Sequence, residues 1–243
     1  MSRRAAPASS GGRFARTGDD RMLDAFAARA AHALGAGVSI AGGYSTLLRE
    51  RYADVLGVEG TDALASLDGG IGRVRLFVDD LLELSAVDTA SLRREQMGPT
   101  TVARAAAEGL ADPIDDARTT VTVGPLPDVI ADPELLERMF HHLLRGALAA
   151  IGSGPGEIAI TGVRRAAGVR VSIADTGTPL DQATALELFE PFTTPRGSGP
   201  IAGASVSMAI AGRIAERHGG SIWAHTGRRD GCTIVVLLPE SAA

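Results

Sequence analysis

The sequence predicts an α+β protein in which a helical hairpin precedes an α/β sandwich. Two observations lead to this prediction. Apolar residues recur at helical spacing through two long stretches, and a break at residues 57–60 separates them. After Met-Gly-Pro at residues 97–99, strand patterns alternate with helical ones, which is typical of a sheet with helices on one face. This change of pattern places a domain boundary near residues 90–98.

The chain divides into three segments. Residues 1–18 are rich in Arg, Ala, Ser and Gly without periodicity, and we expect a disordered tail. Residues 19–92 form the hairpin domain and residues 98–243 form the sandwich domain. Because two helices enclose too little interior of their own, we expect the hairpin's apolar stripe to pair with a second copy in a dimeric four-helix bundle.

Each element of the two domains has its own signal in the sequence. In the hairpin, helical periodicity runs from about residue 20 to 56 and again to about residue 87. In the sandwich domain, helical and strand patterns alternate, and the strands need not be parallel. We expect helices at about 100–111, 133–151 and 207–218, and strands at 121–126, 157–165, 168–175 and within 221–239.

Composition narrows the class of protein. Hydrophobic residues make up 45% of the 243 residues but aromatics only 4%, so the core must consist mostly of aliphatic side chains. The net charge of −5 and the absence of a basic stripe argue against a nucleic-acid partner. The single cysteine, Cys232, permits no intrachain disulfide and is expected to be buried in a strand. No apolar run approaches a membrane span of roughly 18 residues and no signal peptide is visible, so we expect a cytoplasmic protein without a membrane partner.

Several short motifs follow one another in a fixed order through the second domain. They are ADPELLERMFHHLL, ADTG, FEPFTT, GASVSMAI, ERHGGSIWAHT and GCTIVVLLP. Together with the hairpin, this ordered set resembles a histidine kinase core from about residue 20 to 240. The hairpin is most similar to that of the phytochrome-associated subgroup. The resemblance implies a dimerisation and phosphoacceptor domain, followed by an ATP-binding domain of the kinase, gyrase and Hsp90 type.

His32 falls at the position of the family's phosphoacceptor histidine. Its placement on the helix agrees, since at about 100° per residue it lies opposite the apolar stripe and should point outward. The resemblance places an acidic helper at the next position, where this chain has Ala33, and a polar group at Ala36. His32 therefore lacks a neighbouring carboxylate to orient its ring or accept its proton.

The helix at 133–151 corresponds to the segment that holds Mg²⁺ and the ATP phosphates in the family. Two asparagines and a lysine of the family become His142, Gly146 and Ala149 here. Gly146 offers no side-chain ligand, and the imidazole of His142 suits Mg²⁺ poorly. A glycine inside a helix costs about 1 kcal/mol against alanine, so its presence needs a reason. We expect His141 and His142 to lie at the edge of the apolar face of this helix, where its surface begins to face solvent.

The residues that contact adenine in the family are better retained in this sequence. The resemblance assigns Asp175 to the adenine amino group, Gly177 to close backbone approach and Thr233 to the pocket wall. A turn residue at the end of a strand is the alternative interpretation of Asp175. Pro179 replaces a second glycine.

The phosphate side is altered. Of the family's glycines that bring backbone N–H groups to the phosphates at a helix start, only Gly203 remains, and Ser205 and Ser207 replace the others. Arg196 stands where relatives carry a basic lid residue, although a solvated loop arginine fits equally.

Three functions remain open, all within two-component signalling. In the first, ATP-dependent autophosphorylation is impaired, ATP and Mg²⁺ are doubtful cofactors, and His32 relays phosphate to or from the aspartate of a response regulator. In the second, the protein is a non-catalytic scaffold for a receiver domain or a partner kinase. In the third, it is an active sensor histidine kinase.

Overall fold

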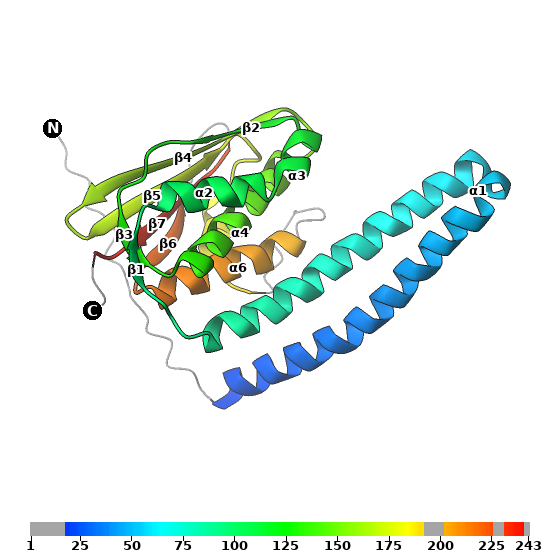
Figure 1. Cartoon of the computed structure of the whole chain (residues 1–243), viewed down its shortest axis with the longest axis horizontal. Helices are drawn as coiled ribbons and strands as arrows, with labels where there is room; N and C mark the ends of the chain where they lie inside the picture. The colour runs from blue at the N-terminus through cyan, green and yellow to red at the C-terminus, as the bar shows by residue number, and fades with distance from the viewer. Residues whose placement is uncertain (1–17, 192–201, 226–230, 241–243) are drawn as a thin grey trace.

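The computed structural model describes residues 18–191, 202–225 and 231–240. A long helical hairpin, α1 (Gly18–Thr89), leads into an α/β domain (Figure 1). The chain reverses at Gly57, whose φ of 62° and ψ of −170° interrupt the helix. A positive φ favours glycine because it has no Cβ, so Gly57 suits the turn. The expected break at 57–60 is confirmed at residue 57, and residues 58–60 already belong to the second helix.

The hairpin buries little of its own apolar surface. Val78 and Leu81 form a small cluster with Phe77, and a Cβ built on Gly35 would lie 3.6 Å from Val78 Cγ1. Many larger apolar side chains of the hairpin remain exposed within one chain. They include Ile40, Tyr44, Leu47, Tyr52, Val55, Val58, Leu67, Val74 and Leu76.

The second domain is built on a five-stranded sheet of order β2-β4-β5-β7-β6. Only β2 (Thr119–Val123) and β4 (Gly156–Arg165) run parallel. The remaining pairs are antiparallel and join β4 to β5 (Gly168–Asp175), β5 to β7 (Thr233–Leu238) and β7 to β6 (Ser221–His225). The mixed sheet and its covering helices confirm the predicted α+β class.

Three longer helices cover one face of this sheet (Figure 1): α2 (Pro99–Glu108), α4 (Pro133–Ile151) and α6 (Ala202–Arg217). Four short elements escaped the sequence prediction. They are β1 (Glu95–Met97), its antiparallel partner β3 (Val129–Ala131), α3 (Ala111–Asp116) and α5 (Gln182–Glu187).

The core lies between α4, α6 and the sheet. Fully buried side chains of α4 pack with aliphatic residues of the strands, and Cys232 is buried beside them as expected. The largest of these side chains are Leu136, Met139, Phe140, Leu143, Leu144, Ile160, Ile173, Ile210, Ile214 and Leu238. Aliphatic packing therefore supplies most of the hydrophobic stabilisation, as the low aromatic content required.

Asp132 begins α4 and connects it to two other segments. Its carboxylate accepts hydrogen bonds from the backbone N–H of Leu135 (3.1 Å) and of Arg93 (2.8 Å). Its own N–H donates to Nε2 of His218 (3.0 Å). Burial raises the pKa of Asp132, but these hydrogen bonds outweigh it and hold the pKa below its usual value. One buried residue thus ties α4 to the interdomain linker and to the end of α6.

The hydrogen bonds of His218 require a neutral ring. Nδ1 donates to the carbonyl of Ile214 (2.8 Å), so Nε2 must be the nitrogen that accepts from Asp132 N–H. Burial, and to a smaller extent Arg94 and Arg217, lower the pKa of His218. Protonation would remove the acceptor and leave two N–H donors facing each other.

We predict that acid destabilises the fold through His218. Because its folded-state pKa lies below the unfolded value of about 6.5, only the unfolded chain gains a proton as the pH falls through this range. The free energy of unfolding in urea should therefore decline between pH 8 and 5.5. The variant His218→Gln should show a shallower decline. Some slope will remain, since burial also lowers the pKa of His141. Equal slopes in both proteins would contradict the prediction.

Candidate functional site

His32 lies on the first helix of the hairpin, level with the contact between the hairpin and the second domain. Gly35 faces Val78, and the two helices run antiparallel with a rise of about 1.5 Å per residue. His32 is therefore level with about residue 81 of the second helix. The described side chains of α1 begin at Leu34, so the expected outward direction of the imidazole stays a prediction.

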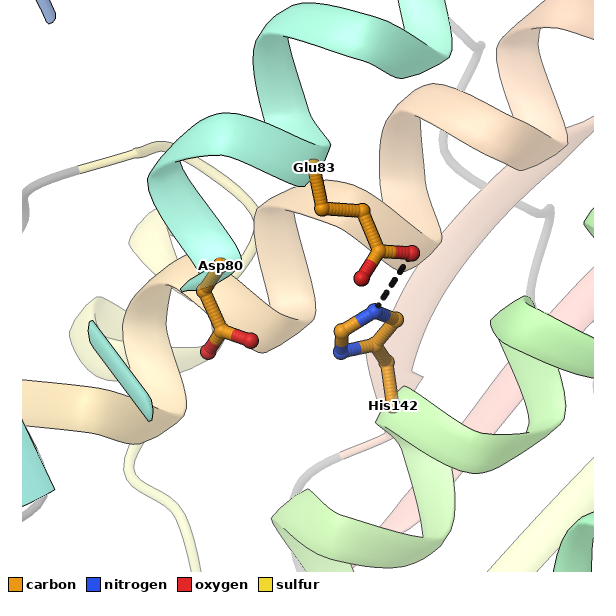
Figure 2. A group of neighbouring side chains, drawn as sticks. All are labelled: Asp80, Glu83 and His142. Atoms are coloured by element: carbon orange, nitrogen blue, oxygen red, sulfur yellow. Dashed lines mark ion pairs between the residues drawn. The ribbon is translucent and has the colours of Figure 1, made fainter. Parts of the chain in front are cut away.

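Opposite that level, one face of α4 meets the second hairpin helix through charged side chains. Arg138 Nε donates to Glu83 Oε1 at 2.7 Å, and His142 Nε2 lies 3.1 Å from the same oxygen (Figure 2). Arg145 Nη1 donates to Asp80 Oδ1 at 3.0 Å, and Nη2 contacts Oδ2. The two carboxylates thus meet two guanidinium groups and one imidazole.

His142 is buried, which corrects the expectation that it faces outward. Its exposed fraction is 2%, because the second hairpin helix covers it. Its Nδ1 has no hydrogen-bond partner among the described residues. The side chain at the position of the family's first asparagine therefore bonds Glu83.

Ser207, which replaces a family glycine, joins the same contact. Its hydroxyl accepts from Arg145 Nη2 at 2.6 Å and donates to Asp80 Oδ2 at 3.2 Å, and the residue is fully buried. The serine therefore links α6 to both α4 and the hairpin. Its hydroxyl stabilises the ion pair between Arg145 and Asp80.

Met208 explains the glycine in the middle of α4. A Cβ built on Gly146 would lie 2.3 Å from Met208 Cε and 3.3 Å from its Sδ. The space that an asparagine would use at this position is filled by a buried methionine of α6. A side chain at residue 146 would therefore have to displace the end of the Met208 side chain from its buried position.

The neighbouring groups hold Glu83 in its charged form. Burial raises the pKa of Glu83, but the hydrogen bonds and charges of His142 and Arg138 outweigh burial and lower the pKa to about 2. Asp80, Glu83 and His142 each place a ligand atom within 4.8 Å of the others, a spacing that a cation could use. However, the guanidinium groups of Arg138 and Arg145 already neutralise both carboxylates.

The site does not fit the Mg²⁺ that the resemblance implies. Gly146 has no ligand atom, a side chain there would collide with Met208, and the Nε2 of His142 bonds Glu83. Hard cations such as Mg²⁺ require oxygen ligands in near-octahedral geometry, which these positions do not offer.

On the adenine side, Asp175 ends β5 and is almost fully buried. Its Oδ1 accepts from the backbone N–H of Gly177 (2.8 Å) and of Cys232 (3.2 Å). These bonds suit a turn residue and leave the adenine role a prediction. A Cβ on Gly177 would lie 2.5 Å from the carbonyl carbon of Ala150, so packing against α4 also requires this glycine. Thr233 is the first residue of β7 and pairs with Ala174 of β5, next to Asp175.

The remaining predicted residues are only partly described. Gly203 lies in the first turn of α6. Arg196 lies in residues 192–201, outside the described residues. The second hairpin helix lies between the first hairpin helix and α6 (Figure 1).

The sequence prediction missed Asp80, Glu83 and Met208. The signal for the first two was the acidic spacing in VDDLLELS, which places both carboxylates on one helix face. The arginines at 138 and 145 form a complementary pair on α4. Met208 gave no signal, since a buried methionine looks like any other core residue.

Comparison with known proteins agrees with this architecture. Residues 131–242 match the family described as histidine kinase-, DNA gyrase B- and HSP90-like ATPases. The chain is 25% identical over 217 residues to phytochrome-like protein Cph1 of Synechocystis, which covers 89% of this chain and 29% of Cph1. The chain has a histidine kinase core. The match to Cph1 must include most of the hairpin, given its length.

Solved histidine kinases share this fold. Full-length ShkA in complex with AMPPNP superposes with a TM-score of 0.65 at 20% identity, covering 90% of this chain and 47% of ShkA. ThkA in complex with the response regulator TrrA gives 0.63 at 20% identity, covering 92% of this chain and 63% of that one. The chain thus spans only part of each relative. Among its described residues, no helix has the length and apolar character needed to cross a membrane.

We predict that alanine at Gly146 fails to stabilise the protein. In an open helical site, Gly→Ala should stabilise by about 0.5–1 kcal/mol. At Gly146 the new Cβ forces Met208 aside, at a cost of about 1–3 kcal/mol. Urea unfolding of Gly146→Ala should therefore show lower stability than that of Gly43→Ala, where a Cβ meets no atom within 4 Å. Equal gains in both variants would contradict the proposed packing.

Proposed function

We propose that this histidine kinase core relays phosphate through His32, to or from an aspartate of a response regulator, with little ATP-dependent autophosphorylation of its own. One observation supports the proposal that ATP-dependent autophosphorylation is weak. The positions that correspond to the family's metal and phosphate ligands, 142, 146 and 207, are all engaged in contacts within the chain. Membership of the histidine kinase family supports the proposed phosphate relay.

Phosphate transfer from a receiver does not need the altered nucleotide side. The His32 ring nitrogen would attack the phosphorus of the aspartyl phosphate, the P–O bond to the carboxylate would break, and a P–N bond would form. The ring gives up its N–H proton and the receiver recovers a free carboxylate. The receiver brings its own Mg²⁺ and acidic residues, so the absence of an acidic side chain at Ala33 matters less for this transfer than for reaction with ATP.

The exposed apolar residues of the hairpin support a homodimer. Ile40, Tyr44, Val55 and Val58 are each more than half exposed in one chain, although the helix that carries them is long and otherwise regular. Exposed apolar surface on this scale marks an interaction site. Pairing two hairpins into a four-helix bundle would bury it.

A scaffold without phosphotransfer is the second candidate, and Ala33 favours it because no neighbouring carboxylate orients His32. An active kinase is the third, and the retention of Asp175, Gly177 and Gly203 favours it. The next two experiments separate the three functions.

We predict that His32 accepts phosphate from a receiver domain. Receiver domains labelled with radioactive acetyl phosphate are mixed with the purified protein, and acid-labile, base-stable label is followed on the chain. Label should appear on the wild type and be absent from His32→Gln, which should also abolish signal output. If His32→Gln retains wild-type output and no receiver donates phosphate, the protein acts as a scaffold.

We predict that ATP binds weakly. Titration calorimetry with ATP and Mg²⁺ should show a dissociation constant above about 1 mM, corresponding to less than about 4 kcal/mol of binding free energy. Asp175→Ala serves as the control for the adenine pocket. Tight binding by the wild type that Asp175→Ala abolishes would contradict this prediction and favour the active kinase.

A further inference from the structure

We propose that the contact between the second hairpin helix and α4 is a charge latch, which fixes the hairpin over the side of the domain that corresponds to the family's metal and phosphate site. The charge latch consists of Asp80, Glu83, Arg138, His142, Arg145 and Ser207. Its acidic members come from the hairpin and its basic members from α4. The inference concerns the arrangement of the two domains and does not rest on phosphate relay.

Residue spacing makes the two faces of the latch complementary. Asp80 and Glu83 are three residues apart, so both carboxylates project from one face of the hairpin helix. Arg138, His142 and Arg145 are separated by four and three residues and also share one face. Each carboxylate therefore meets its own guanidinium group, and a shift of the hairpin by one turn would leave charges without partners.

The base of the hairpin is attached in a different way. Val87 is fully buried and belongs to the core of the α/β domain, with Leu84 packed against that core. Arg217 donates to the carbonyl oxygens of Val87 and Ala90. Apolar packing, these hydrogen bonds and an ion pair between Asp88 and Arg213 (3.2 Å) therefore hold the hairpin at its base. The charge latch begins about one helical turn above Val87 and adds a second point of attachment, and two points along the helix define its angle.

The latch closes the side of the pocket that resembles a phosphate site. His142 and Ser207 are buried by it, and both use their polar groups to hold the hairpin. The carboxylates of Asp80 and Glu83 occupy the cationic face of α4 as an anionic ligand would. A phosphate-bearing ligand could reach this face only after the hairpin moved away.

Ion pairs, and not a bound cation, account for the latch. Both carboxylates already face guanidinium groups, so a divalent cation would add two positive charges to a site that is near neutral. The low pKa of Glu83 keeps its carboxylate charged at neutral pH. The latch is therefore closed under ordinary conditions and is opened by loss of its charges.

The test uses pulsed electron spin resonance to measure the distance between two spin labels, which changes when the angle of the hairpin changes. Spin labels are placed at the hairpin end with Glu59→Cys and at the β4–β5 turn with Ala167→Cys, both exposed, in a Cys232→Ser background. Labelled chains are diluted with unlabelled chains, so that any dimer contributes only distances within one chain. The protein with an intact latch should give one narrow distance distribution. Adding Asp80→Asn and Glu83→Gln should broaden it at least twofold.

Glu240→Gln is the matched control, since it removes the carboxylate of an exposed ion pair with Arg164 on the sheet. It should leave the distance distribution unchanged. Circular dichroism establishes that every variant is folded. The proposal is overturned if the folded Asp80→Asn/Glu83→Gln protein keeps the narrow distribution, or if the control broadens it to the same extent.

Discussion

The arrangement of the protein depends on one helix, α4, whose two opposite faces need different neighbours. Its apolar face lies on the sheet and supplies the largest side chains of the core. Its other face carries two arginines and a histidine, which the hairpin covers. Burying His142 and Arg145, whose side chains are 2% and 21% exposed, without partners would cost several kcal/mol, so the hairpin helix must bring carboxylates to the same level. Asp80 and Glu83 meet this requirement, and the position of the hairpin follows from it.

Ion pairs of this kind specify an arrangement more than they stabilise it. The energy lost by removing two charges from water offsets much of their attraction, so a buried pair is weak support for stability. Removal of one partner is nevertheless expensive, since the other charge stays buried alone. In this protein the contacts at Val87 and Leu84 hold the base of the hairpin, and the ion pair between Asp80 and Arg145 adds a second point of attachment further along the helix.

The sequence predicted elements with local signals and missed those formed by distant contacts. The bounds of α4 were predicted correctly because Asp132 caps it, Pro133 opens it and Gly152 ends it with a φ of 76°. The three-residue strands β1 and β3 have no such signals, since each exists only through pairing with the other. The predicted turn near residue 57 was correct because glycines mark it. The outward orientation expected for His142 was wrong because the helix that buries it lies about 60 residues earlier in the chain.

The same distinction applies to the candidate site. The order of the motifs located positions 142, 146 and 207. The residues found there showed that the family's asparagines and glycine are absent. The sequence could not show that these substitutions depend on one another. Gly146 accommodates Met208, the neighbouring Ser207 bonds Asp80, and His142 bonds Glu83. Restoring an asparagine at residue 146 alone would therefore displace Met208 without opening the space for a metal. These contacts depend on one another, because side chains of the chain itself occupy this face of α4, and a ligand could reach the face only if the hairpin moved first.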